Sequence, residues 1–411
     1  MRVAIQTLGT RGDVQPYIAL ARALMARGHE VQLCAPAQFE GLVSDHNVPF
    51  APVPGEFLAL LDKPEGKAAV AGSKGFGAGF KLLKHIRPLM RAVLDAEWEA
   101  MRGFEPDAIV YHPKSMASPS AAEKLGRPCI LASPLPGFTP TSAFPVPLLP
   151  FRSLGPFNRA SHQLAILGPR LLFGRMMRAW REASLGLRGA QGASPVGTVY
   201  AYSPHVLPVP KDWGPDVLVS GYWFLDGGDW TPPERLKRFL DDGPLPVYIG
   251  FGSMPGVDAD RMSATMIETL RMSGKRGLLA SGGGALRVGD MPQHIHLIEH
   301  APHDKLLPHV AATIHHGGAG TTAASLRVGK PMTICPFFGD QPFWARRMHE
   351  LGVAPPPLDR KNLSAAEVAS AIASMDGEAM RERASALGAA IQKENGCSLA
   401  ARFIERSCAP A

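Results

Sequence analysis

The sequence lacks most features that mark secreted or membrane-spanning proteins. Only five of its 411 residues are cysteine, and none of them forms a CxxC pair. This odd, dispersed set excludes a disulfide framework and predicts reduced thiols in a cytoplasmic protein. We expect no membrane-spanning helix, because no run of about 18 apolar residues occurs. The apolar run in the N-terminal stretch MRVAIQTLGTRGD is too short for a secretory signal.

Charged residues are also scarce, at 19% of the chain, and the net charge is +7. The basic residues are scattered rather than gathered in a dense tract, which argues against a nucleic-acid partner. The small basic excess suits acidic small ligands or a membrane surface. With 45% hydrophobic residues the chain is globular, and its length predicts two domains.

Strand-like and helix-like segments alternate in each half of the chain. This alternation is typical of a parallel doubly wound sheet, and it predicts an α/β fold with two Rossmann-like domains. Residues 204–233 contain six prolines and no helical period, as an interdomain linker would. Ligands bind at the carboxyl ends of parallel strands, so we expect the domains to face each other across a cleft. The predicted parts are an N-terminal domain (1–215), a C-terminal domain (216–385) and a helical segment that packs back on the first domain (386–411).

One insertion interrupts this alternation. Residues 139–156 are proline-rich and apolar, and residues 157–187 form a helical pattern of Leu, Met, Phe and Trp interspersed with Arg. One interpretation is a loop followed by a helix that faces the core. The other is a wall for an apolar substrate or a patch that rests on lipid headgroups.

The stretch IHHGGAGTTAASLRVGKP (314–331) combines a strand end, a glycine-rich turn and the start of a helix. Glycine lets a ligand approach the backbone, and the first N–H groups of a helix carry partial positive charge. We therefore predict an anion site that suits phosphate, with His315 as a further donor. The alternative is a turn that needs glycine only for its shape. The stretch has neither the Walker lysine nor GxGxxG spacing, which disfavours a nicotinamide cofactor.

Two motifs resemble those of a known family. HHGGAGTTAASLRVGKPMTICPFFGDQPFWARRMHELG resembles the donor-site signature of family-1 glycosyltransferases of the GT-B fold. The similarity is greatest to the bacterial and fungal branch that includes sterol glucosyltransferases and antibiotic aglycone glycosyltransferases. MRVAIQTLGTRGDVQPYIALARALMARGHEV is similar to the N-terminal motif of that branch. The resemblance implies a GT-B fold, with two facing Rossmann-like domains and a cleft between them.

The resemblance also implies roles in binding a nucleotide-sugar. His315 would contact the diphosphate, so that the imidazole and the helix end carry the charge that a metal ion would otherwise carry. No metal and no cofactor are then expected. Asp340 and Gln341 would bind hydroxyls of the hexose, in the pairing usual for glucose donors; the alternative is a helix cap. The other implied donor-site residues are Gly12, Ser253, Ala301, His303, Gly318, Ala319, Gly320 and Thr321.

Asp13 occupies the position at which plant members of the family carry a catalytic histidine. A carboxylate there can accept the proton of an attacking acceptor hydroxyl, so the resemblance implies that Asp13 is the catalytic base. The alternative is that Asp13 only caps the helix expected to begin near Pro16. In another departure from the plant pattern, Ala323 replaces a Glu that grips the ribose, which leaves UDP and dTDP both open.

Two short motifs imitate metal sites. The DAD at 258–260 resembles a DxD metal motif, but it stands where a helix begins and is better explained by capping. The HIH at 294–296 has the spacing of ligands on a strand without a further ligand nearby, and is better explained as a strand face.

Together with the resemblance, these observations predict a cytoplasmic, inverting, UDP-dependent or dTDP-dependent hexosyltransferase. Its donor would be UDP-glucose, and its acceptor a hydroxyl of an apolar molecule such as a sterol, lipid alcohol, carotenoid or polyketide. Peripheral membrane contact is a further hypothesis, and no nucleic-acid partner is expected. The alternatives are a catalytically silent relative that binds another enzyme, and a nucleotide-sugar epimerase.

Overall fold

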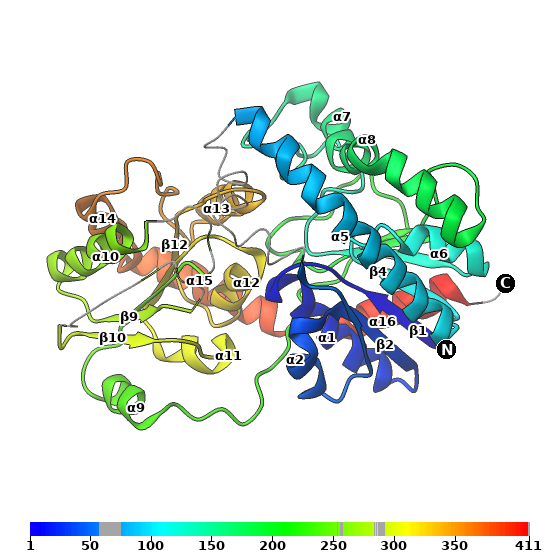
Figure 1. The fold of residues 1–411 in the computed structure, drawn as a ribbon. Helices are drawn as coiled ribbons and strands as arrows, with labels where there is room; N and C mark the ends of the chain where they lie inside the picture. The colour runs from blue at the N-terminus through cyan, green and yellow to red at the C-terminus, as the bar shows by residue number, and fades with distance from the viewer. Residues whose placement is uncertain are drawn as a thin grey trace. The chain divides into compact units, whose positions relative to one another are not determined.

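The computed structural model describes residues 1–56, 75–252, 254, 258–282, 284, 286 and 292–409, with side chains from residue 88 onward in the helix that begins at Gly75. The chain forms two compact units. The N-terminal unit comprises Met1–Leu225 and Glu394–Ala411, and the C-terminal unit comprises Asp226–Lys393. Each contains one parallel sheet (Figure 1).

The sheet of the N-terminal unit has the strand order β3-β2-β1-β4-β5-β6-β7, and all its pairs are parallel. This is a doubly wound order, in which the direction of winding reverses between β1 and β4. Its strands are β1 (Arg2–Gln6), β2 (Glu30–Pro36), β3 (Phe50–Val53), β4 (Ala108–Tyr111), β5 (Cys129–Ser133), β6 (Gly197–Tyr200) and β7 (Val217–Val219).

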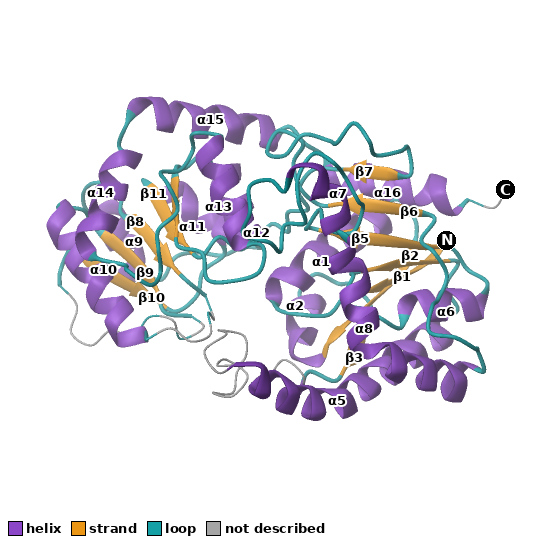
Figure 2. Ribbon diagram, turned by 90° about the horizontal axis from the view of Figure 1, so that it is seen from above, coloured by secondary structure: helices purple, strands orange, loops and turns teal. Residues whose placement is uncertain are grey.

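Helices cover both faces of this sheet. The helices are α1 (Arg11–Met25), α2 (Glu40–Ser44), α5 (Gly75–Phe104), α6 (Ser118–Leu125), α7 (Asn158–Ser161), α8 (Gln163–Trp180) and α16 (Gly396–Cys408). Successive side chains of a strand point to opposite faces. Val3 and Ile5 accordingly pack with α1 and α16, whereas Ala4 packs with α5, α6 and α8 on the other face (Figure 2).

Helix α1 begins at Arg11, five residues before the predicted start near Pro16. Thr10 is its N-cap, and the Thr10 backbone N–H donates to Asp13 Oδ2 at 2.8 Å in a capping box. This arrangement satisfies donors that the helix end would leave unpaired. The capping role of Asp13 is therefore present, and it does not exclude a second role.

The first unit extends beyond residue 215 because β7 pairs with β6 and completes the sheet. The second unit ends at Lys393 rather than 385, after α15 (Glu378–Gln392). The chain then returns to the N-terminal unit, where Ser203 Oγ donates to a carboxylate oxygen of Glu394. On α16, Glu405 accepts hydrogen bonds of 2.7 Å from Arg27 and from His29, which fasten this helix to the turn between α1 and β2.

The sheet of the C-terminal unit has the order β10-β9-β8-β11-β12, again fully parallel, and reverses between β8 and β11. One face packs on α10 and α14, the other on α9 and α11. The strands are β8 (Val247–Gly250), β9 (Gly277–Ala280), β10 (Ile295–Ile298), β11 (Ala312–His315) and β12 (Met332–Ile334). The remaining helices are α9 (Glu234–Asp241), α10 (Ala259–Ser273), α11 (His303–Leu306), α12 (Ala319–Arg327), α13 (Gln341–Glu350) and α14 (Ala365–Met375).

The cysteines follow the expectation of reduced thiols. All five cysteines are free thiols, and four of them are buried. Across the ranges that the structure describes, no helix combines the length and the apolar character needed to cross a bilayer.

Candidate active site

Each sheet has a reversal point, and polar residues follow its strands there. Open parallel sheets bind ligands outside the carboxyl ends of the strands at such points. In the N-terminal unit Asp13 follows β1, and in the C-terminal unit His315 ends β11. Both residues therefore lie where the topology alone predicts a ligand.

The Asp13 carboxylate is held by two neighbours. Oδ1 accepts a hydrogen bond of 2.8 Å from Lys114 Nζ. Oδ2 accepts one of 2.8 Å from the Thr10 backbone N–H and one of 3.2 Å from Thr10 Oγ1. The side chain is still 18% exposed, so a bound molecule can reach it. Asp13 is thus both positioned and accessible.

Lys114 and His112 follow β4, and the sequence interpretation did not include them. They reach Asp13 because β4 pairs with β1 in the sheet. The His112 Nδ1 accepts from the Lys114 backbone N–H at 3.1 Å, which places the ring proton on Nε2. Nε2 lies 3.5 Å from Asp13 Oδ1. Polar residues at the end of the neighbouring strand (YHPK, 111–114) were the signal that could have identified both.

Burial lowers the pKa of His112 to about 3, although Asp13 acts in the opposite direction. The ring is therefore neutral at pH 7 and contacts Asp13 as a neutral group, not as an ion-pair partner. Burial by itself would raise the pKa of Asp13. Three effects lower it: the positive charge of Lys114, that of a protonated His112, and the hydrogen bonds from Lys114 and Thr10. Together they outweigh burial, so the pKa of Asp13 is lowered. Because His112 is neutral at pH 7, we assign the lowering mainly to Lys114. Asp13 is ionised at neutral pH, as a proton acceptor must be.

Gly9 makes room for this carboxylate. Its backbone φ is +137°, a value that residues with a side chain rarely adopt. A Cβ at this position would lie 2.1 Å from Asp13 Oδ2 and 2.8 Å from Lys114 Nζ. Any other residue at this position would displace the carboxylate or the ammonium.

His315 carries an unpaired donor in a buried place. Its side chain is fully buried, and Nδ1 accepts from the Gly317 backbone N–H at 3.0 Å, so the proton is on Nε2. Within the described part of the chain, no hydrogen-bond partner reaches Nε2. A buried N–H without a partner is costly, so Nε2 is a candidate contact for a ligand.

His315 is a neutral donor, which corrects one sequence expectation. Burial, followed by the effects of His316 and His303, holds the pKa of His315 well below its ordinary value. The imidazole therefore offers a hydrogen bond but does not carry the positive charge that was expected of it. The start of α12 supplies partial positive charge at this site.

The helix end belongs to α12, which starts at Ala319 with Gly318 as N-cap and no capping side chain. The first backbone N–H groups of this helix have no partner within the helix. A Cβ at Gly318 would lie 2.5 Å from His316 Nε2, and one at Gly317 (φ +87°) would lie 2.6 Å from Ile334 Cγ2. The glycines are thus required by the tight turn, and the same turn presents the N–H groups of Ala319, Gly320 and Thr321.

Asp340 and Gln341 are tied into the start of α13. Gln341 Oε1 accepts from the backbone N–H groups of Phe337 (2.7 Å) and Phe338 (3.2 Å), so its carbonyl organises the preceding loop. Asp340 Oδ2 accepts from Trp344 Nε1 at 2.9 Å instead of capping the helix backbone. These two side chains therefore do not cap the backbone of α13, contrary to the helix-cap alternative.

The other predicted residues are placed as follows. Ala301 is buried just before α11, and His303 is the first residue of α11, with Nε2 3.3 Å from the Tyr248 hydroxyl. Gly12 is exposed in the first turn of α1. Ser253 lies outside the described residues. Ala323, which stands where plant members carry the ribose-binding Glu, is buried within α12.

The two imitations of metal sites have structural roles. The Asp258 side chain accepts from the Arg261 backbone N–H and caps α10, as expected. The His296 ring stacks on Phe239, with 5.2 Å between ring centroids. Among the residues with described side chains, no group of three or more His, Cys, Asp or Glu could hold a metal ion.

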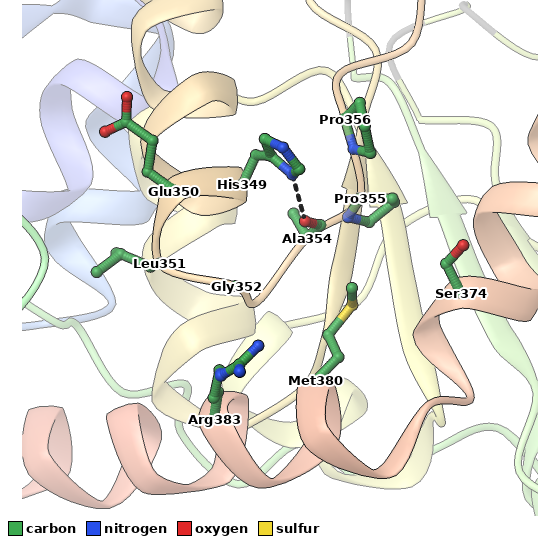
Figure 3. A pocket seen from close by; sticks show the side chains of 10 residues that line it. All are labelled: His349, Glu350, Leu351, Gly352, Ala354, Pro355, Pro356, Ser374, Met380 and Arg383. Atoms are coloured by element: carbon green, nitrogen blue, oxygen red, sulfur yellow. Dashed lines mark hydrogen bonds between the residues drawn. The ribbon is translucent and has the colours of Figure 1, made fainter.

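A surface pocket of about 540 Å³ lies at the C-terminal end of α13 (Figure 3). His349 Nδ1 donates to the Ala354 carbonyl there at 3.1 Å, and Met380 and Arg383 of α15 close the opposite side. None of the predicted site residues lines this pocket, so it is separate from the turn that carries His315.

Both units of the chain match known protein families. Residues 3–145 match the Glycosyltransferase family 28 N-terminal domain, and residues 282–396 match the Erythromycin biosynthesis protein CIII-like, C-terminal domain. The structure superposes on that of glycosyltransferase VinC in complex with DTDP with a TM-score of 0.71, at 18% identity and over 99% of each chain.

Curated relatives align over nearly the whole chain. The sterol 3-beta-glucosyltransferase UGT80B1 of Arabidopsis thaliana is 34% identical over 429 residues, which cover 100% of this chain and 68% of that protein. A sterol 3-beta-glucosyltransferase of Neosartorya fischeri is 36% identical over 440 residues, which cover 99% of this chain but only 29% of that protein. The chain is thus a GT-B glycosyltransferase, and it belongs to the family of the sterol 3-beta-glucosyltransferases.

Proposed function

We propose that this glycosyltransferase moves glucose from UDP-glucose to the hydroxyl of a sterol or related lipid alcohol, with inversion at the anomeric carbon. The names of the aligned relatives support glucose as the sugar and a sterol as the acceptor. UDP is chosen over dTDP on the sequence resemblance. The DTDP bound in the VinC structure makes dTDP-glucose the donor to test beside it.

The unpaired Nε2–H of His315 carries the proposal. It is a buried donor beside the uncapped start of α12, which offers further backbone N–H groups. Such a set suits the oxygens of a diphosphate. It also suits a leaving diphosphate, because fixed donors stabilise charge that develops in the transition state. A neutral imidazole and a helix end can do this without a metal ion.

The proposed reaction has one chemical step. Asp13 takes the proton of the acceptor hydroxyl while the acceptor oxygen forms a bond to the anomeric carbon. The bond from that carbon to the diphosphate breaks on the opposite face, and the nucleoside diphosphate leaves with the electron pair. Attack on the face opposite the leaving diphosphate converts an α-linked donor into a β-glycoside. Lys114 keeps Asp13 ionised before the step.

The test is release of nucleoside diphosphate from UDP-glucose and from dTDP-glucose, with and without a panel of sterols, lipid alcohols and phenols. We expect UDP release that depends on a sterol or lipid alcohol, together with a β-glucoside product identified by NMR. Equal release without acceptor would favour hydrolysis or epimerisation. Nucleotide binding without turnover of any pair would favour the silent-partner alternative.

A pH profile tests the part that Lys114 plays. In Lys114→Met the pKa of Asp13 should rise, because the ammonium that lowers it is gone. The base is active only when ionised, so the acid limb of kcat/KM should move to higher pH by about one unit. Lys114→Arg retains the charge and should keep the wild-type limb. An unchanged limb in Lys114→Met would contradict this role.

A further inference from the structure

Helix α8 carries apolar side chains on two faces. Its inner face is ordinary, because Ala165, Met177 and Trp180 are buried. Trp180 Nε1 donates to Asp95 Oδ1 of α5 at 2.8 Å, which fastens α8 along that helix (Figure 2). This contact uses the apolar stripe that a surface helix normally presents to its core.

The solvent-facing side of α8 carries apolar residues, whereas the solvent-facing side of a surface helix normally carries polar ones. Leu164, Leu167 and Leu171 follow one another at spacings of three and four residues and so share one side of the helix. Their exposed fractions are 58%, 41% and 85%. Leu172 is also exposed on this helix, and Phe157 is exposed just before α7. We call these five residues the outer apolar face.

The concentration of apolar surface here is local. Thirteen large apolar side chains are exposed among the described residues, and seven of them lie between residues 148 and 172. Single exposed apolar residues need no explanation, whereas a group on one helix face indicates an interaction surface. No neighbouring element of the described chain covers Leu171, which is the most exposed of the seven.

The charge around this face identifies its partner. Residues 124–181 contain no Asp or Glu, so all 36 acidic residues of the chain lie elsewhere. Five arginines lie between residues 148 and 180. Arg159 among them pairs with Asp212 at 3.2 Å. Arg175 and Arg178 follow Leu171 at spacings of four and seven, so they continue the same side of α8 in exposed positions. Apolar side chains at the level of the acyl boundary, with arginines at the level of the phosphates, match an anionic bilayer surface. A second copy would place the same positive face against itself, which like-charge repulsion opposes.

We propose that the outer apolar face of α8, with Arg175 and Arg178, docks this protein onto bilayers that contain anionic phospholipids. The leucines enter the interface between headgroups and acyl chains, and the guanidinium groups bind lipid phosphates. This docking does not depend on which sugar or acceptor the enzyme uses.

Sedimentation of the full chain with vesicles tests the proposal. Vesicles of phosphatidylcholine with phosphatidylglycerol should bind the wild type, and salt should weaken the binding. The variant Leu164→Ser/Leu167→Ser/Leu171→Ser should lower the bound-to-free ratio by about tenfold or more, because less apolar area enters the interface. Arg175→Gln/Arg178→Gln should lower it by about fivefold per charge on anionic vesicles, and much less on pure phosphatidylcholine.

A matched control removes exposed apolar residues elsewhere. Leu245→Ser/Met272→Ser/Leu399→Ser changes side chains that are 47%, 50% and 39% exposed, and it should bind vesicles like the wild type. Circular dichroism and thermal unfolding should be unaltered in all three variants. Three results would overturn the proposal: a wild type that stays in the supernatant, leucine variants that bind as well as the wild type, or a lipid-free dimer that the leucine variant converts to a monomer.

Discussion

Asp13→Asn is expected to lower kcat by about 10²- to 10⁴-fold, the range in which a positioned general base acts. The substitution keeps an oxygen that can accept the Thr10 backbone N–H, so the capping box at the start of α1 is largely retained. It removes the negative charge, and with it the capacity to take the proton of an acceptor hydroxyl. Steady-state turnover with the acceptor found in the UDP-release screen, at saturating donor, measures the effect.

Two comparisons separate this loss from misfolding. Asp107→Asn changes an aspartate whose Oδ2 also accepts a backbone N–H, that of Arg2 at 2.8 Å, before β4 and away from the carboxyl ends of the strands. It should leave turnover unchanged. UDP affinity of Asp13→Asn should stay close to that of the wild type, because Asp13 acts on the acceptor. Retention of more than a tenth of the wild-type kcat would argue that Asp13 only caps the helix.

His315→Ala should give the second large loss, about 10²- to 10³-fold in kcat, which is the range for removing one donor to a developing oxyanion. Affinity for UDP should fall as well, because the same Nε2–H meets the diphosphate before the reaction. His315→Gln keeps an amide donor on a side chain of similar reach and should recover part of the activity. Calorimetric titration with UDP and turnover assays measure the two effects separately.

The pH dependence and the stability of this variant add controls. The pKa of His315 lies well below its ordinary value, so we expect no titration of this ring in the wild-type rate around neutral pH. His315→Ala also leaves the Gly317 backbone N–H without its acceptor, at a cost of about 1–3 kcal/mol in folding free energy. His309→Ala removes an exposed imidazole from the same unit and should change neither activity nor stability. Full UDP affinity in His315→Ala would remove the main support for the proposed donor site.

Several parts of the fold were not predictable from local sequence patterns. Strand β3 contains Pro52, β6 begins at Gly197, and β7 lies in the proline-rich stretch 204–233, so local patterns favoured loops there. The N-terminal start of α1 depended on a capping box that places Asp13 at the third helical position, whereas the proline at residue 16 suggested a later start. The long α5 was not predicted either, although it supplies much of one face of the first sheet.

By itself, the sequence determined the features that arise from neighbours along the chain. The alternation of apolar strands and amphipathic helices specified two parallel sheets, and glycines after a buried strand specified a helix start with unpaired N–H groups. The tertiary structure decided what depends on distant residues. Lys114 meets Asp13 across 101 positions only because β4 lies beside β1. The neutral state of His315 follows from burial by the fold around it. A helical period specifies an apolar face but not what covers that face. The packing of Trp180 shows which side of α8 contacts the core, and only then can the exposed leucines be distinguished from core residues.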